Sequence, residues 1–353
     1  MKKFLLTLVF VPLTTLSAIS DWDYMPFISY TGQYPTEIIR QGRNFELLQV
    51  LWDKPQNLQT LHNSGFDLSD IDTTLLINQG MIYRKDNKYY SAIPFIDSLA
   101  TDKLRIMAHA LAENIIEDTK PEMQKFFSTL DNAGCKEYAF PLVHSLVFDD
   151  IIWKHLGVSC DNATICPTDS MSWNGIFYFF RPEGTDTYGT NGIRLNDKQM
   201  LKFSWGNNSN AYLCTTFVQT NILKAIRCIL NGEELNDDMI RDCKTFGVID
   251  DNNLLLIPVL NGQDKISNAA DVWADSAAQS FSKHFDGENI ADTIDWSGNY
   301  NEAACKVIIY HEVLSAIDKV LDTKGMLPVP EILKLNTPSD KKQTASVAYI
   351  TTR

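Results

Sequence analysis

Two segments of this chain repeat one pattern of residues, and that repeat limits the possible folds more than any other feature. The first segment covers residues 65–96 and the second covers residues 234–260. Each predicts a short helix that ends at a glycine, Gly80 in the first and Gly247 in the second, 167 positions apart. Each continues as an alternating hairpin that ends in Ile-Pro. A repeated supersecondary unit predicts two similar units within one chain.

Apolar residues at helical spacing predict the elements around the two segments. Phe45 and Leu48 begin such a pattern, and Asp67 or Ser69 can cap the helix that Gly80 ends. The predicted elements are helices over 44–52, 57–62, 67–80, 103–116 and 140–155, two strands over 83–93, and later helices over 266–285 and 301–324.

Three short helices followed by a two-stranded hairpin resemble the winged-helix superfamily, most closely over residues 44–96 and again over residues 220–260. The resemblance implies an α+β, mostly helical fold with two winged-helix-like units and added helices. Duplicated helices of this kind often bury each other's apolar faces, as two subunits would. We therefore expect an internal pseudo-dimer with a β-rich insert between the units.

A segment rich in aromatic and β-branched residues separates the two halves. It predicts strands over 176–180, 200–205 and 211–218, in a sheet that connects the units or extends the second. The last residues are polar and are expected to be loosely held. The predicted organisation is a signal peptide at 1–20, a first unit at 21–157, a β-rich connecting segment at 158–218, a second unit at 219–335 and a polar tail at 336–353.

The first twenty residues follow the order of a secretory signal peptide. Lys2 and Lys3 precede an apolar run over 4–13, and small residues lead to a cleavage site before Asp21. The run is shorter than the about 20 residues that a spanning helix needs, so we expect no stable membrane span in the mature chain. The competing interpretation is a buried N-terminal strand in a cytoplasmic protein, with Met25 as a second start site.

The cysteine content fits export only in part. Seven is an odd number, so at least one cysteine has no partner within the chain. Cys160 and Cys166 flank a polar loop and could close a small disulfide in an oxidising compartment, with two unpaired loop thiols as the equal alternative. Four others lie in apolar runs, where a thiol behaves as a small hydrophobe.

The acidic character of the chain argues against nucleic acid as a partner. The formal charge is −13, which repels polyanions and anionic lipids. Winged-helix domains commonly lay the third helix in the major groove, but residues 67–79 carry three acidic and no basic side chains. The basic residues Arg84, Lys85 and Lys88 lie in the first hairpin, where a solvated tip is the preferred explanation over a DNA contact.

Two histidines share the offset of the repeated glycines. His144 and His311 are 167 positions apart, so they could meet across a pseudo-twofold axis and form a ligand site. A buried, hydrogen-bonded structural histidine in each half is the preferred interpretation. His144 and His155 share a helix face but lie roughly 16 Å apart, too far to bind one metal ion. No nucleophile, phosphate-binding or metal motif is present, so no catalytic residue, cofactor or metal is predicted.

Aromatic residues gather between the two halves. Trp173, Tyr178, Tyr188 and Trp205 are candidate ligand contacts, because aromatic side chains beside polar loops can bind sugars or peptides. The core of a small sheet is the preferred alternative for these residues.

These observations favour a non-enzymatic, exported binding protein, periplasmic or secreted, whose ligand is a protein, a small molecule or a glycan. The alternative is a cytoplasmic protein similar to winged-helix transcription regulators, with weak or lost DNA binding. A third class, an exported hydrolase, would need a metal or nucleophile site assembled across the two halves.

Overall fold

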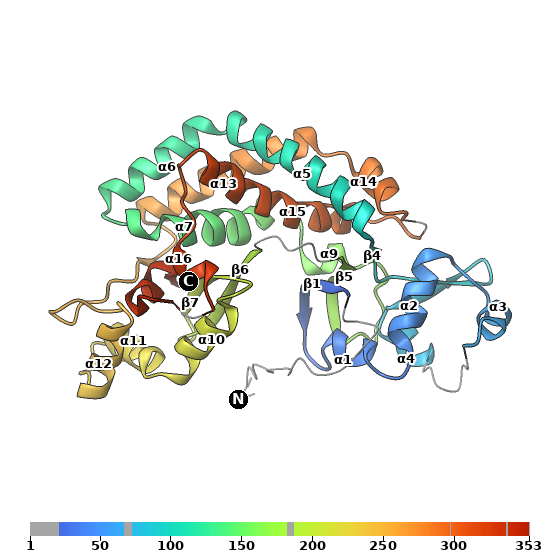
Figure 1. Ribbon diagram of the computed structural model, residues 1–353, viewed down its shortest axis with the longest axis horizontal. Helices are drawn as coiled ribbons and strands as arrows, with labels where there is room; N and C mark the ends of the chain where they lie inside the picture. The colour runs from blue at the N-terminus through green and yellow to red at the C-terminus, as the bar shows by residue number, and fades with distance from the viewer. Residues whose placement is uncertain (1–20, 67–72, 182–186, 297, 337, 353) are drawn as a thin grey trace.

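The computed structural model shows an arch of long helices from which two smaller lobes extend (Figure 1). It describes residues 21–66, 73–181, 187–296, 298–336 and 338–352. The fold is α+β, with 55% of residues in helices and 16% in strands, so the predicted mostly helical α+β class is confirmed. No helix within these ranges is both long enough and apolar enough to cross a membrane.

The first lobe is built on a three-stranded sheet. Its elements are β1 (Asp23–Tyr30), α1 (Pro35–Ile39), α2 (Asn44–Asp53), α3 (Leu58–Asn63), α4 (Thr73–Asn78), β2 (Ile82–Lys85), β3 (Lys88–Ser91), β4 (Phe95–Ile96), α9 (Cys160–Ala163) and β5 (Trp173–Phe180). The central strand β5 pairs antiparallel with β1 and parallel with β4. Strands β2 and β3 form the first hairpin. Its turn residues Asp86 and Asn87 both have positive φ, as a tight two-residue hairpin turn requires.

The second lobe contains a four-stranded sheet in the order β6-β7-β9-β8. Its elements are β6 (Tyr188–Arg194), β7 (Gln199–Gly206), α10 (Asn210–Gln219), α11 (Ile222–Asn231), α12 (Asp237–Thr245), β8 (Val259–Leu260), α16 (Glu331–Lys334), η3 (Lys341–Val347) and β9 (Ala348–Thr352). Residues 248–256 form the second hairpin, in which Ile249 and Leu255 pair as an antiparallel bridge.

The arch joins the two lobes. Its elements are α5 (Ser98–Asp118), α6 (Lys120–Asn132), η1 (Lys136–Tyr138), α7 (Ala139–Pro141), η2 (Leu142–Ile151), α8 (Ile152–His155), α13 (Lys265–His284), α14 (Gly287–Thr293) and α15 (Glu302–Thr323). Helix α5 packs against α15 and α13, and α13 also packs against α6 and η2. At the centre of these contacts the fully buried Trp273 meets the rings of Phe126 and Phe148 at 5.5 and 5.0 Å. Helices from both halves of the chain therefore share one core.

The order of elements in the first half recurs in the second. In each half a strand leads into short helices, a hairpin and a short strand, then into long helices of the arch, and finally into a strand that returns to the lobe. Helices α5 and α13 begin after Asp97 and Asp264, whose side chains cap them and which are 167 positions apart. The returning strands β5 and β9 each pair in parallel with the short strand of their own lobe.

Most of the predicted elements are confirmed. They are the helices realised as α2, α3, α5, α13 and α15, the first hairpin, and the strands β5 and β7. The candidate caps Asp67 and Ser69 and the predicted signal peptide at 1–20 lie outside the described residues. The strands within 158–218 do not form one sheet, because β5 belongs to the first lobe whereas β6 and β7 belong to the second.

The predicted strand over 211–218 is wrong. These residues form most of α10, in which Leu213 and Phe217 are one helical turn apart and fully buried. Phe217 packs on Phe203 of β7 with ring centroids 4.8 Å apart. Burial of this face against the sheet outweighs the β propensity of the threonine and valine side chains.

The expectation of a loosely held tail is also wrong. Residues Ala348–Thr352 form β9, which lies between β7 and β8 in the second sheet. Ala348, Tyr349 and Ile350 are fully buried there. The lysines at 341 and 342 make the segment polar in composition, but the chain beyond them completes the core of the second lobe.

Candidate functional site

A groove of about 830 Å³ lies where the first lobe meets the arch. Its walls come from α2, β4 and the start of α5 in the first half, and from α14 and the residues that follow it in the second. The volume is within the range of small-molecule sites, about 300–1,000 Å³. Three tryptophans and four aspartates are among the residues that line it.

Two of the tryptophans meet across the groove. Trp52 in α2 and Trp296 after α14 have ring centroids 5.8 Å apart, with their planes inclined at 68°. Asp295 adopts a left-handed conformation with φ 52°, and the next amide, that of Trp296, returns to the carbonyl of Ala291 at 2.9 Å. Aspartate tolerates this backbone conformation better than most residues. The turn therefore ends α14 and directs the Trp296 ring toward Trp52.

The third tryptophan is held by an arginine. The Arg181 guanidinium lies over the Trp22 ring, 4.1 Å from its centroid, and donates from Nη1 to the carbonyl of Asp21 at 2.9 Å. Trp22 in turn meets Phe95 of β4 edge to face at 5.5 Å. Because Arg181 follows β5 directly, the sheet of the first lobe fixes this side of the groove.

The carboxylates give the groove its charge. Asp53, Asp97, Asp292 and Asp295 line it against Lys103 and Arg181. Within the part of the chain that the structure describes, none of the four has a cationic side chain as an ion-pair partner. Partial burial, and then repulsion from Asp97, raise the pKa of Asp53. Like charges that face one another in this way favour a ligand with hydrogen-bond donors or a positive charge.

His144 and His311 lie elsewhere, at the centre of the molecule. His144 belongs to η2, a ten-residue π-helix, and its Nδ1 is 2.7 Å from Oδ2 of Asp318 in α15. Both side chains are buried, with 1% and 0% of their surface exposed. Burial alone would lower the pKa of His144, but the charge and hydrogen bond of Asp318 outweigh burial, so the pKa is raised. His144 and Asp318 thus form a buried hydrogen-bonded pair between the two halves.

His311 has a different environment. Its Nδ1 lies 2.8 Å from the carbonyl oxygen of Val307, so this nitrogen carries the proton and donates it. Burial lowers the pKa of His311, and the nearby Asp149 carboxylate only partly opposes this shift. Asp149 also interacts with His144 and hydrogen-bonds Thr190. The two histidines therefore share a carboxylate neighbour, and their packing matches the structural interpretation.

The π-helix marks this central region as unusual, since such helices are rare and are often found at functional sites. Among the described residues, however, no three histidine, cysteine or acidic side chains are arranged to hold a metal ion. Nε2 of His144 and Oδ1 of Asp318 have no hydrogen-bond partner there.

The four predicted aromatic contacts belong to the sheets. Trp173 and Tyr178 of β5 are 5% and 4% exposed, within the core of the first lobe. Tyr188 and Trp205 are half-buried on the paired strands β6 and β7, where a Cβ at Gly189 would lie only 2.5 Å from the Trp205 ring. These residues are not brought together in one cleft, and the sheet-core alternative describes them.

Sequence reasoning missed the three groove tryptophans because they are scattered along the chain. A local signal was present. The three occur as Asp21-Trp22-Asp23, Trp52-Asp53 and Asp295-Trp296, whereas none of the other four tryptophans has an adjacent aspartate. Aromatic residues directly beside carboxylates were the pattern that could have pointed to this groove.

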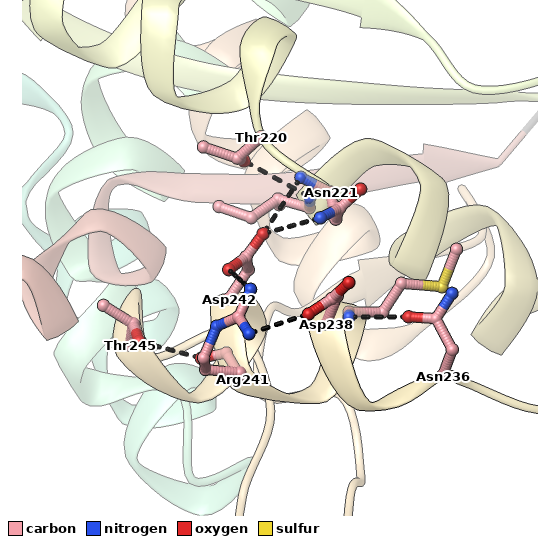
Figure 2. Close-up of polar contacts among 9 residues, drawn as sticks. Thr220, Asn221, Asn236, Asp238, Arg241, Asp242 and Thr245 are labelled. Carbon is pink, nitrogen blue, oxygen red and sulfur yellow. Dashed lines mark hydrogen bonds and ion pairs between the residues drawn. The ribbon is translucent and has the colours of Figure 1, made fainter.

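Helix α12 precedes the second hairpin, and its arginine is paired within the helix (Figure 2). Arg241 donates to Asp238 at 2.7 Å and to Asp242 at 3.5 Å. Asp242 accepts a further hydrogen bond at 2.8 Å from the side chain of Asn221, ahead of α11. The arginine is therefore neutralised by its own helix, which leaves little positive charge for a phosphate.

The structure also shows where the predicted basic residues and the two loop cysteines lie. Arg84, Lys85 and Lys88 are exposed in the first hairpin, where Arg84 hydrogen-bonds Asn87 in the turn. Cys160 and Cys166 are both free thiols, so the possible disulfide is not formed.

No family model, curated protein or solved structure matches this chain.

Proposed function

We propose that the chain is an exported, non-enzymatic binding protein built on two winged-helix-like units, and that its ligand occupies the groove between the first lobe and the arch. The observation that carries the proposal is the convergence of Trp22, Trp52 and Trp296 with unpaired carboxylates in one hollow. Aromatic walls with a few polar groups are the usual construction of a small-molecule site.

The recurring order of elements supports duplication. The first-lobe and second-lobe sheets each contain a parallel pair, formed by the short strand and the returning strand. The helices that follow the two short strands begin at capping aspartates 167 positions apart, the same offset as Gly80 and Gly247. Both glycines have positive φ. A shared offset across helices, caps and turns is the expected trace of one ancestral unit.

Contacts within the arch support the pseudo-dimer. The indole Nε1 of Trp273 donates to Thr119 Oγ1 at 3.0 Å, and the hydroxyl of Tyr310 donates to the carbonyl of Phe148 at 2.9 Å. Each bond joins one half of the chain to the other in a buried position. The halves bury apolar helix faces against each other, as the two subunits of an isologous dimer do.

The groove chemistry favours a hydroxylated ligand that is neutral or cationic, such as a sugar or an amino sugar. Carboxylates accept hydrogen bonds from hydroxyl and ammonium groups, and tryptophan rings pack against the apolar faces of such molecules. An anionic ligand would meet four carboxylates and only two cations.

The test compares the three groove tryptophans with the other tryptophans of the same protein. The protein is labelled with 5-fluorotryptophan and titrated with neutral sugars, amino sugars and acidic sugars, and fluorine NMR follows all seven tryptophans. We expect a neutral or amino sugar to shift the resonances of Trp22, Trp52 and Trp296 and to leave buried Trp273 unchanged. No response at the three groove positions, or a preference for acidic sugars, would reject the proposal.

Export rests on the sequence of residues 1–20 alone. The intact mass and the cell fraction of the native protein test it, since export predicts a mature N-terminus at or near Asp21 outside the cytoplasm. A full-length chain, or one that begins at Met25, within the cytoplasm would contradict it.

The second candidate is a cytoplasmic protein of the winged-helix regulator type with weak or lost DNA binding. The observation that favours it is that all seven cysteines are free, as is common in a reducing compartment. A low-salt titration with random duplex DNA tests it. Measurable affinity that falls when Arg84, Lys85 and Lys88 are replaced by alanine would favour this candidate.

A further inference from the structure

The second hairpin carries apolar side chains on both of its faces. Leu256 donates its amide to the carbonyl of Val248 at 2.9 Å, and Asp250 donates to Leu254 at 3.0 Å, so residues 254–257 are extended and paired along one edge. Ile257 is buried, with 2% of its surface exposed, whereas Leu254 and Leu256 are 63% and 42% exposed. Alternate residues of an extended segment point to opposite faces. One face thus serves the core, and the outer face presents two leucines to solvent.

The exposed position of these two leucines is unusual for large apolar side chains. The loop that contains them projects from the second lobe beside α12, away from the arch (Figure 1). Exposed apolar residues that cluster in this way indicate an interaction surface more often than isolated ones do.

The segment that carries this surface is rich in acidic residues. Between Gly232 and Asn261 the chain has seven acidic and two basic residues. Neither of the two basic residues is free: Arg241 is bound by Asp238 and Asp242, and Lys244 donates to the carbonyl of Asp251. From the neighbouring η3, Lys341 lies over the ring of Phe246 at 5.8 Å. In this part of the second lobe the exposed carboxylates Glu233, Glu234, Asp237 and Asp251 outnumber the exposed lysines Lys341 and Lys342 of η3.

The acidic charge near this surface favours some binding partners over others. A second copy of the chain, related by a twofold axis, would bring the same acidic hairpin against itself. Nucleic acid and anionic lipid would be repelled for the same reason. We propose that the outer face of the second hairpin docks a cationic amphipathic segment of another protein, whose apolar side chains pack on Leu254 and Leu256 while its lysines or arginines face the surrounding carboxylates. This site is separate from the groove and does not depend on the ligand that the groove binds.

The test measures binding of a defined probe to the full chain. A fluorescently labelled nine-residue peptide of alternating lysine and leucine is titrated at physiological ionic strength and followed by anisotropy. Two further peptides replace its leucines or its lysines with serine. We expect the double variant Leu254→Ser and Leu256→Ser to weaken binding of the lysine–leucine peptide by about tenfold or more. The matched control, Ile106→Ser with Val272→Ser, removes two apolar residues of the arch that are at least as exposed, and it should leave binding unchanged.

A charge variant and a mapping experiment complete the test. Glu234→Lys with Asp251→Lys should weaken binding of the lysine–leucine peptide, and should do so more strongly at low salt than at high salt. Hydrogen exchange should show protection over 253–259 when the peptide binds.

Three results would overturn the proposal. The lysine–leucine peptide could bind the wild type and the leucine double variant equally, which would show a charge effect alone. The serine–leucine peptide could bind as tightly as the lysine–leucine peptide, which would remove the role of charge. The wild type could self-associate in sedimentation while the leucine double variant stays monomeric, which would identify a second copy as the occupant.

Discussion

The two hairpins follow the same elements in the two halves of the chain, yet they present opposite chemistry to solvent. The first is basic, with Arg84, Lys85 and Lys88 exposed around a tight turn. The second has two exposed leucines beside an acidic helix. Both hairpins also contain buried residues, with Ile82 at 1% and Ile257 at 2% exposed. The fold therefore determines the inner residues of each hairpin and leaves the outer residues open to separate functions.

The same contrast extends to the surfaces near the lobes. The groove lies between the first lobe and the arch and is lined by tryptophans and aspartates. The proposed docking face lies at the far edge of the second lobe. If both proposals hold, the two halves have kept one architecture and acquired two kinds of partner, a small ligand and a cationic protein segment.

The largest expected effect concerns the buried pair that joins the halves. Asp318→Ala would leave buried His144 without the carboxylate that raises its pKa, and removal of one partner of a buried ion pair costs about 3–5 kcal/mol. Urea unfolding of the two proteins measures the loss. The control is Asp275→Ala, which removes a half-exposed carboxylate 3.2 Å from His155 and should cost less than about 1 kcal/mol. Equal losses would mean that the halves do not depend on the central pair.

The next effect tests whether the repeated glycines are equivalent. Gly80 and Gly247 have φ 64° and 70°, and a Cβ at either would lie 2.3 Å from a backbone carbonyl oxygen, that of Cys166 or Lys342. Gly232 has φ 71° but open space around a Cβ. Gly232→Ala should therefore cost only the left-handed strain, about 1–2 kcal/mol. Gly80→Ala and Gly247→Ala should both cost about 1–3 kcal/mol more because of the clash.

Thermal or urea unfolding of the three glycine variants measures these losses. Gly80→Ala could lose much stability while Gly247→Ala loses no more than Gly232→Ala. That result would contradict the equivalence of the two glycines, because only one of the two turns would then exclude a Cβ.

A third prediction follows from the direction of the pKa shifts. The pKa of His144 is raised in the folded protein, so proton binding favours folding. Its contribution should be complete below about pH 6.5, the ordinary pKa of histidine, and should be lost as the pH rises through the raised value. His311 has a lowered pKa, so its contribution has the opposite sign and is lost as the pH falls through the lowered value.

NMR titration of the histidine rings separates these two contributions, with His144→Gln and His311→Gln used for assignment. We expect the midpoint of His144 above that of His311. The advantage in stability of the wild type over Asp318→Asn should also be greatest in mild acid. The reverse order of midpoints would contradict the buried ion pair.

The elements that sequence reasoning identified are those whose signals are local. Apolar residues at helical spacing predicted α2 and α5, and alternation predicted the first hairpin, because each of these elements carries its own pattern within a short segment. The prediction of a strand over 211–218 is wrong. Its threonine and valine side chains favour a strand, but burial of Leu213 and Phe217 favours a helix. That burial depends on β7 and is not visible in the segment itself.

The candidate site was harder to predict for a related reason. Trp22, Trp52 and Trp296 come from three distant parts of the chain, and only the packing of α14 against the first half brings them together. The aromatic cluster between the halves was conspicuous in sequence because its members are close in number. In the structure these aromatic residues belong to two different sheets, although they are close in sequence.

The smallest expected effect decides how the contrast between the hairpins is explained. Exposed substitutions away from special features change stability by less than about 0.5 kcal/mol, so Lys85→Ser with Lys88→Ser should leave the free energy of unfolding unchanged. We expect the same of Leu254→Ser with Leu256→Ser, measured by urea unfolding under identical conditions, because both leucines are largely exposed. A loss of more than about 2 kcal/mol in the leucine variant would mean that these side chains pack against the lobe. The apolar face would then serve folding, and the reason to expect a partner there would disappear.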